Sequence, residues 1–345
     1  MRMNLRNKTG HDRKFHLLSL LALLDLCSIA ISLRIGPIDI PFHEIFSAIF
    51  IRGGVESALR DPLLSSIILD IRLPRVLLAA LSGGALSIAG VLFQSLLRNI
   101  LADPYILGVS SGAVVGALVS MITGFNTVFF AASTVCAFFG ALLVIVLVYL
   151  FGARLASNES SALLLSGVMV GAFLGAVTLI LLALMVDPLR NATFWLLGYF
   201  GGATTYEVAL TSIVVAIGMA ILLPLAPSIN ALALGEQQAV HLGVSRRRTA
   251  GVLYVVGSLF TALIVSLVGS IGFVGLIVPH FARRIFGSDH RTLIPGAFFL
   301  GVAFLVISDL LARVAFYPVE LPVGAITAAL GAPLVVYVVR KARQM

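Results

Sequence analysis

Long apolar runs dominate the sequence, and they restrict the possible folds more than any other feature. A helix needs roughly 20 apolar residues to cross the ~30 Å hydrocarbon core of a bilayer. Hydrophobic residues make up 60% of the 345 residues and charged residues only 11%, unlike a soluble domain. The sequence therefore predicts an all-α polytopic membrane protein, folded as a single domain over residues 1–345. Ten transmembrane helices are expected, at residues 15–34, 72–97, 107–123, 128–151, 162–186, 207–226, 249–269, 272–287, 294–312 and 321–340.

Basic residues orient these predicted helices, because cytoplasmic loops of membrane proteins are enriched in lysine and arginine. If the N-terminus is cytoplasmic, the majority of the 23 basic residues fall on the inner side. This bias predicts an even number of spans, with both termini on the cytoplasmic side of the inner membrane. Residues 35–71 then form the longest outer loop, and their prolines and glycines predict a cap of short elements. The net charge of +8 fits the same bias, so we expect no nucleic-acid partner.

The sequence carries no recognisable catalytic motif. Its three lysines are Lys8, Lys14 and Lys341, and none of them follows a glycine. A phosphate-binding GxxxxGK[ST] loop is therefore excluded. The histidines and cysteines are dispersed and lack the spacing of a zinc site. We expect a transport subunit without catalytic residues, ATPase site, metal site or cofactor.

Two acidic residues lie within the predicted spans and leave an alternative open. Carboxylates inside a membrane often mark proton relays. Asp25 lies near the centre of the first predicted helix, and Asp309 lies close to the outer end of the ninth. A proton-coupled secondary transporter could use either residue, although a helix–helix hydrogen bond is the commoner role for such an acid. The leading hypothesis is instead a partner that supplies the energy.

Residues 230–248, NALALGEQQAVHLGVSRRR, form a long polar interruption in the second half of the chain. Pro224 and Pro227 are expected to end the preceding helix. Gly235 and Gly243 bracket a short predicted helix, with Gly243 as its stop signal. A short helix in a cytoplasmic loop is suited to docking into a groove of another protein. A solvated surface loop is the simpler interpretation of the same residues.

These residues also resemble a known family. Leu234-Gly235-Glu236, Ala239 and Leu242-Gly243-Val244 are similar to the cytoplasmic coupling segment of the permeases that import iron-siderophores, haem and cobalamin. These permeases belong to type II importers powered by ATP-binding-cassette (ABC) subunits. Five further stretches resemble family motifs in the same order, although the family commonly has proline where this chain has Ile100. The stretches are RLPR at 72–75, residues 99–113, FWLLG at 194–198, GFVGLIVPH at 272–280 with Arg283, and residues 320–333.

The resemblance implies a set of partners. A second permease copy would form a homodimer around one translocation path. Two cytoplasmic ABC ATPases would bind beneath, and a periplasmic or lipid-anchored substrate-binding protein would bind above. The ATPase coupling role falls by position on Gly235, Glu236, Ala239, Leu242 and Gly243.

The resemblance also implies roles at the outer face. Arg72, Arg75 and Arg313 match arginines that meet acidic residues of the binding protein, and the planar guanidinium suits such carboxylates. The simpler interpretation is interfacial anchoring, or pairing with Asp70 and Asp309.

The remaining implied sites are a gate and a path. The turn with Ser157, Asn158, Glu159 and Ser160 would close the path on the cytoplasmic side. The helix at 162–186 would line the path, with Gly167, Met169, Gly171, Gly175 and Thr178. The glycines of this helix recur every four residues, a spacing that also serves close helix packing.

The cargo implied by the resemblance is a metal chelate. A ferric siderophore is the first expectation, haem and cobalamin come next, and an oxyanion such as molybdate is a further option. The competing classes are the proton-coupled carrier and a membrane-embedded enzyme or redox subunit. The sequence offers no ligand pair or catalytic cluster for the last of these.

Overall fold

The computed structural model describes residues 2–50, 62–125, 131–155, 159–185 and 196–342, and every element within these ranges is a helix. The predicted all-α class is confirmed. The elements are α1 (Arg2–Arg34), α2 (Phe42–Phe50), α3 (Pro62–Ser66), η1 (Ile67–Arg72), α4 (Leu73–Leu97), η2 (Pro104–Leu107), α5 (Val109–Ile122), α7 (Ala132–Leu155), α8 (Glu159–Leu184), α10 (Thr205–Leu234), α11 (Glu236–His241), α12 (Arg246–Val268), α13 (Val274–Phe286), α14 (His290–Val314) and α15 (Val323–Ala342).

Each of the ten predicted ranges contains a helix, but the helices differ in length. Among the described residues, seven helices are long and apolar enough to cross a membrane. The apolar parts of α5 and α15 are shorter, and α13 has only 13 residues. A helix of that length rises about 20 Å, which is less than the hydrocarbon core of a bilayer. The short predicted range at 272–287 is therefore a helix that lies within the bundle without crossing the bilayer alone.

One predicted boundary is wrong. Pro224 and Pro227 do not end a helix, because α10 continues through both of them to Leu234. Ala226 and Ile229 on the continued segment are fully buried, so packing favours the helix beyond the prolines. Proline is tolerated in membrane helices when neighbouring groups satisfy the freed backbone carbonyls.

The central helix of the bundle is α4. Most of its residues are buried, and its neighbours include α14, α12, α13 and α10. A Cβ atom added to Gly83 would lie 2.1 Å from the carbonyl oxygen of Gly301 on α14. Glycine therefore lets the α4 and α14 backbones touch, which is how helices pack closely without bulky side chains.

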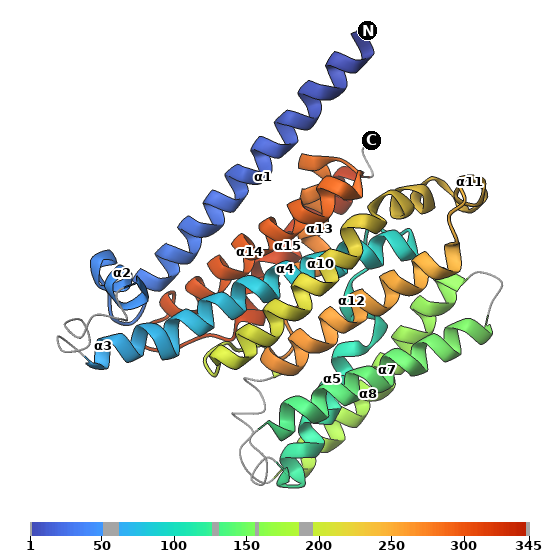
Figure 1. Cartoon of the computed structure of the whole chain (residues 1–345). Coiled ribbons are helices and arrows are strands. Elements are labelled where there is room, and N and C mark those ends of the chain that lie inside the picture. Colours follow the sequence, from blue (N-terminus) through green and yellow to red (C-terminus); the bar gives the residue numbers. More distant parts are fainter. Residues whose placement is uncertain (1, 51–61, 126–130, 156–158, 186–195, 343–345) are drawn as a thin grey trace.

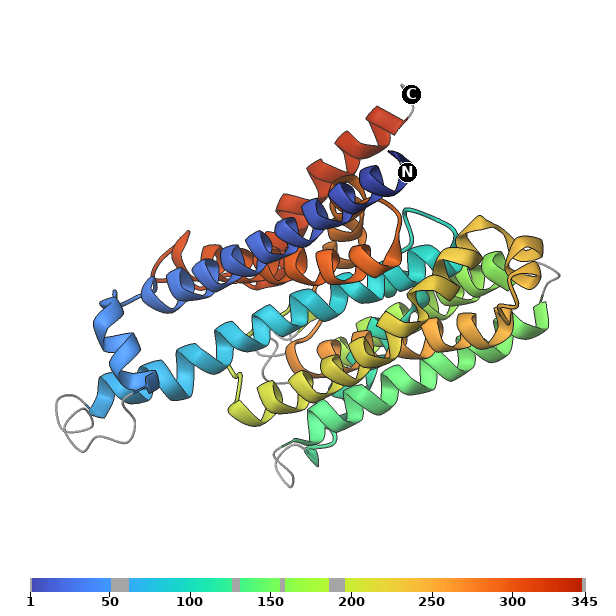
Figure 2. The same ribbon diagram turned by 45° about the horizontal axis from the view of Figure 1, so that its top comes forward.

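Different elements lie at the two ends of the bundle. Figure 1 places the start of α1, the last turn of α15 and the short helix α11 toward one end, with α2 and α3 at the other. Figure 2 keeps the same arrangement after rotation, with α1 lying outside the bundle beside α14. The described parts of residues 35–71 contain the short helices α2 and α3 and the start of η1; their place as an outer cap stays a prediction.

Candidate functional site

The short helix α11 lies between the two glycines that the sequence singled out. Gly235 has φ 128° and Gly243 has φ 72°, values that glycine adopts without steric cost. The Gly243 N–H donates to the Val240 carbonyl at 2.9 Å, and the Val244 N–H donates to the Ala239 carbonyl at 2.9 Å. These bonds satisfy the last carbonyls of the helix, as a left-handed glycine stop does. The predicted short helix and its stop at Gly243 are confirmed.

The side chains of α11 divide into a buried and an exposed set. Ala239 is fully buried and packs with Ala231, Leu232 and Val244 of the same chain. Gln238, Val240 and His241 of α11 are exposed. Three apolar side chains in and beside α11 are each 64–65% exposed, namely Leu234, Val240 and Leu242; we call these three the coupling face.

The coupling face corrects the expected arrangement of the coupling residues. Ala239 was expected to meet a partner, but it points into its own chain. A six-residue helix must bury some side chain to stay attached to the bundle, and Ala239 is that side chain. Leu242 is free to meet a partner, whereas the side chain of Glu236 lies outside the described ones.

Two connections tie the coupling segment to the bundle. Arg98 ends α4 in a left-handed conformation, and its Nη2 donates to the Leu232 carbonyl at 3.2 Å. Asn230 donates to Asp289 and accepts from the backbone N–H of His290. Neither connection could be predicted from the sequence, because the partners lie 134 and about 60 positions away along the chain and no local pattern links them.

A buried ion cluster lies at the opposite end of the bundle. Asp309 of α14 lies between two arginines: Arg75 Nη2 is 3.0 Å from its Oδ1, and Arg313 Nε is 3.1 Å from its Oδ2. Arg75 also pairs with Glu320 at 3.0 Å. Arg313 further donates to the Ser32 hydroxyl at 2.6 Å. The cluster joins α4, α14, α1 and the segment before α15.

The three arginines expected at the outer face, Arg72, Arg75 and Arg313, all form hydrogen bonds within the chain. Arg72 donates to the carbonyl oxygens of Leu33, Arg34 and Ile38, at the turn after α1. Arg72, Arg75 and Arg313 are all buried, so none of them is presented on the surface as a docking residue. The simpler expectation of pairing holds for Asp309, whereas Asp70 accepts from the Ser66 hydroxyl.

The two acids proposed as proton relays have different surroundings. Asp309 is paired with two guanidinium groups, those of Arg75 and Arg313. Asp25 is 4% exposed, and neither of its carboxyl oxygens has a hydrogen-bond partner in the part of the chain that the structure describes. Asp25 is therefore the acid that an alternative proton-coupled function would use.

The predicted path-lining residues on α8 do not share one face. Gly167 and Gly171 lie against Gly108, so these glycines serve close packing. Met169 is 62% exposed, whereas Thr178 donates to its own helix at Leu174.

One side of α8 is left open. Nothing lies within 4 Å of a Cβ added to Gly175. An open apolar groove runs between α7 and α8, lined by Leu143, Leu147, Phe151, Ser166, Met169 and Phe173. The exposed face of α8 is thus available to a second copy or to cargo.

The predicted gate falls largely outside the described residues. Ser157 and Asn158 belong to residues 156–158, which the structure does not describe. Glu159 and Ser160 form the first turn of α8, but their side chains are not among those described. The gate therefore stays a prediction.

These features define an all-helical, multi-pass membrane permease, and comparison with known proteins identifies its family. The profile described as the FecCD transport family matches residues 22–341. The chain belongs to this family, whose members are transport permeases. The resemblance seen in the sequence motifs is confirmed.

Relatives and a solved structure agree with this assignment. The chain is 41% identical over 311 residues to YvrB of Bacillus subtilis, an uncharacterized ABC transporter permease, covering 89% of this chain and 88% of that protein. It is 44% identical over 270 residues to the cobalamin import system permease BtuC of Halobacterium salinarum, covering 78% and 72%. The structure of a metal-chelate type ABC transporter in an inward-facing conformation matches with a TM-score of 0.81 at 30% identity, over 94% of this chain and 99% of that one.

Proposed function

We propose that this protein is the permease subunit of an ATP-driven importer for a metal chelate. It works as a homodimer in the cytoplasmic (inner) membrane, with both termini in the cytoplasm. Two separate ABC ATPases bind at its inner end, and a substrate-binding protein binds at its outer end. The observation that carries this proposal is the exposed, apolar coupling face of Leu234, Val240 and Leu242.

The coupling face is suited to a protein groove. It lies in and beside α11, close in sequence to Arg246, Arg247 and Arg248, and such basic residues favour the cytoplasmic side. Three exposed apolar side chains on one short segment are unfavourable in water, and a partner that covers them relieves this. Ala239 of α11 packs against Ala231 and Leu232 of α10, and α11 connects α10 to α12, so a push on α11 moves both helices.

The outer arginines contribute indirectly to docking of the binding protein. Arg72, Arg75 and Arg313 hold the outer ends of α1, α4 and α14 together, so they shape the surface that the binding protein meets. Glu320 is the more accessible member of their cluster, with a side chain 31% exposed.

The cargo is a chelate that the binding protein selects. We propose cobalamin as the first candidate, which the name of the Halobacterium salinarum relative supports, followed by a ferric siderophore and haem. The exposed side chains of α8, including Met169 and Phe173, offer an apolar wall with few specific contacts. Such a wall suits a path whose selectivity lies elsewhere.

The test is uptake by proteoliposomes that contain the permease, its ATPases and its binding protein. Radiolabelled cobalamin and a radiolabelled ferric siderophore are offered separately, with ATP on the ATPase side. We expect ATP-dependent uptake of one chelate. Failure to take up either chelate, or haem, would refute the proposed cargo class.

A proton-coupled carrier remains the second candidate, because Asp25 is buried and has no hydrogen-bond partner among the described residues. Such a carrier would transport without ATPases. The two candidates are separated by the energy source, which can be measured directly.

A further inference from the structure

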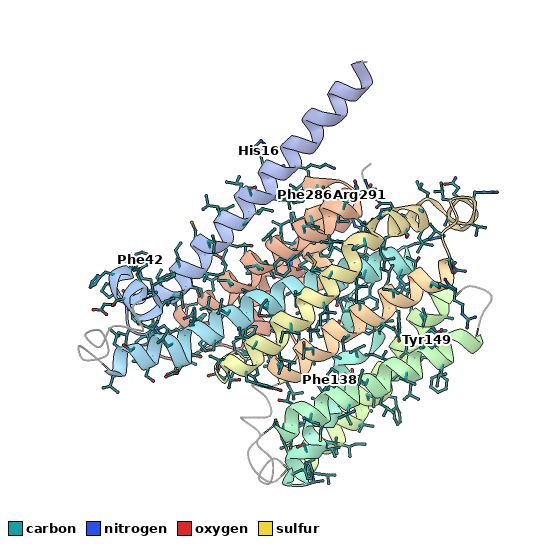
Figure 3. The ribbon with its side chains drawn as sticks, viewed as in Figure 1. His16, Phe42, Phe138, Tyr149, Phe286 and Arg291 are labelled. Carbon is teal, nitrogen blue, oxygen red and sulfur yellow. The ribbon has the colours of Figure 1, made fainter. Side chains whose placement is uncertain are left out.

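A polar cluster lies where the coupling segment joins the bundle. Asn230 stands on the last turns of α10, four residues before the segment turns at Leu234. Its Nδ2 donates to Asp289 Oδ1 at 2.7 Å, and its Oδ1 accepts from the His290 backbone N–H at 2.9 Å. Figure 3 labels Phe286 and Arg291, which flank the α13–α14 turn that carries Asp289 and His290. Asn230 therefore bonds to this turn through both the NH₂ group and the carbonyl oxygen of its amide.

The two bonds fix which way the Asn230 amide points. Asp289 can only accept while it is ionised. Burial opposes ionisation, but the bonds from Asn230 and Arg291 and the charge of Arg291 hold the pKa of Asp289 below its ordinary value. The backbone N–H of His290 can only donate. The amide NH₂ must therefore face Asp289, and the carbonyl oxygen must face His290.

The same orientation fixes the proton on the His290 ring. Nδ1 of His290 lies 2.7 Å from Asn230 Oδ1, an oxygen that has no proton to donate. Nδ1 must therefore carry the proton of this bond. The ring is 1% exposed, and Asn230 locks both its orientation and its tautomer.

The other edge of the ring reaches the central helix. Nε2 of His290 lies 2.7 Å from Ser95 Oγ on α4. Arg283 of α13 lies 3.5 Å from two atoms of α4, Gln94 Oε1 and Ser95 Oγ. One chain of polar contacts thus runs from α10 through α14 to α4, with α13 at its side.

We propose that Asn230 is a positioning residue that carries movement of the coupling segment to α14 and α4. This inference rests on the proposed function. The coupling segment is covalently continuous only with α10 and α12, whereas α4 is the central helix. Directional bonds from Asn230 to Asp289 and His290, and from His290 to Ser95, make α14 and α4 follow α10 when an ATPase moves α11. They add directional bonds to the packing of α10 against α4 and α14 and to the bond from Arg98 to the Leu232 carbonyl.

The test compares Asn230→Asp with the exchange variant Asn230→Asp/Asp289→Asn. In the wild type, the Asn230 amide donates to the Asp289 carboxylate. Asn230→Asp places two carboxylates side by side, and both can only accept, so the hydrogen bond to the α13–α14 turn is lost. The exchange variant restores a donor at 289 and an acceptor at 230, and it keeps the net charge. The readout is ATP hydrolysed per chelate transported in the proteoliposomes described above, with the chelate that the wild type carries.

We expect Asn230→Asp to keep ATPase binding and to raise the ATP hydrolysed per chelate at least fivefold. The exchange variant should return the ratio to within twofold of the wild type. A wild-type ratio in Asn230→Asp, or an unrestored ratio in the exchange variant while ATPases still copurify, would overturn the proposal. A wild type that neither binds ATPases nor transports would instead refute the proposed function.

A second variant tests the same proposal even if Asn230→Asp does not fold. Ser95→Ala removes only the hydroxyl at the far end of the relay and keeps the packing of α4. We expect an unchanged apparent Tm and a roughly threefold higher ratio of ATP hydrolysed to chelate transported. An unchanged ratio in this variant would also contradict the relay.

Discussion

Arg75 of α4 and Asp309 of α14 form a buried ion pair across 234 positions of sequence, with Arg75 Nε donating to Asp309 Oδ1 at 3.1 Å. Arg313, one turn after Asp309, approaches the same carboxylate from the other side. Two cations thus converge on one anion at the end of the bundle that carries α2 and α3, and the closely packed α4 and α14 are locked there.

Removal of this central anion should destabilise the permease strongly. Asp309→Asn leaves two buried guanidinium groups facing each other, and loss of one member of a buried pair lowers the free energy of unfolding by about 3–5 kcal/mol. Glu320→Gln is the matched control, because its side chain is partly exposed and an exposed pair is worth about 0–1 kcal/mol. Thermal unfolding in detergent measures both. Equal losses in the two variants would show that Asp309 does not organise the cluster.

The contact between α4 and α14 should tolerate no side chain at Gly83. The added methyl group of Gly83→Ala would lie 2.1 Å from the Gly301 carbonyl oxygen, so the helices must separate. Overpacking of this kind lowers stability by about 1–3 kcal/mol. Gly251→Ala in α12 is the control, since nothing lies within 4 Å of its added Cβ, and alanine is the better helix former. A neutral Gly83→Ala would contradict the close approach.

The coupling face and the buried Ala239 should respond to substitution in different ways. Leu242→Asp should leave the Tm of the isolated permease unchanged, because Leu242 is largely exposed, and should reduce copurification of the ATPase at least tenfold. Ala239→Trp should lower the stability of the isolated permease by about 1–3 kcal/mol, because the indole has no room beside Leu232 and Val244. Normal stability together with lost ATPase binding in Ala239→Trp would place Ala239 at the interface instead.

The stability of the permease should depend on pH through Asp103, which lies between α4 and α5. Burial raises the pKa of Asp103 to about 6 from the ordinary 3.8, although the Tyr105 backbone N–H donates to it. The folded protein therefore binds this proton more tightly than the unfolded chain does. The stabilisation is complete below pH 3.8 and is lost as the pH rises through about 6, a change on the order of 3 kcal/mol.

Asp103→Asn isolates this effect. The asparagine keeps an oxygen that accepts from the Tyr105 N–H, but it does not titrate. Its apparent Tm should vary less between about pH 4.5 and 7.5 than that of the wild type. The same pH dependence in both proteins would exclude Asp103 as the titrating group.

The apolar runs predicted the helices well because their cause is local: a run of sufficient length must form a helix in lipid. The same logic found α11, since Gly235 and Gly243 carry their conformations in their own residue type. The C-terminal end of α10 was predicted wrongly, and the burial of Ala239 was not predicted at all, because packing within the bundle decided both.

The polar contacts were within reach of sequence reasoning only in part. Pairing of the outer arginines with Asp309 was one interpretation of the sequence, but no local pattern showed that Arg75 and Arg313 both reach this carboxylate. Asn230 was read as part of a polar loop, although it extends α10 and bonds to the start of α14. Such pairs are set by the docking of whole helices, which no local periodicity encodes.

Uptake by two kinds of proteoliposome identifies the energy source of transport. One kind contains this chain alone under an imposed pH gradient, and the other contains the permease, ATPases and binding protein with ATP. We expect chelate uptake only in the second kind, dependent on ATP hydrolysis. Uptake by the chain alone, driven by the pH gradient and abolished by Asp25→Asn, would contradict this expectation.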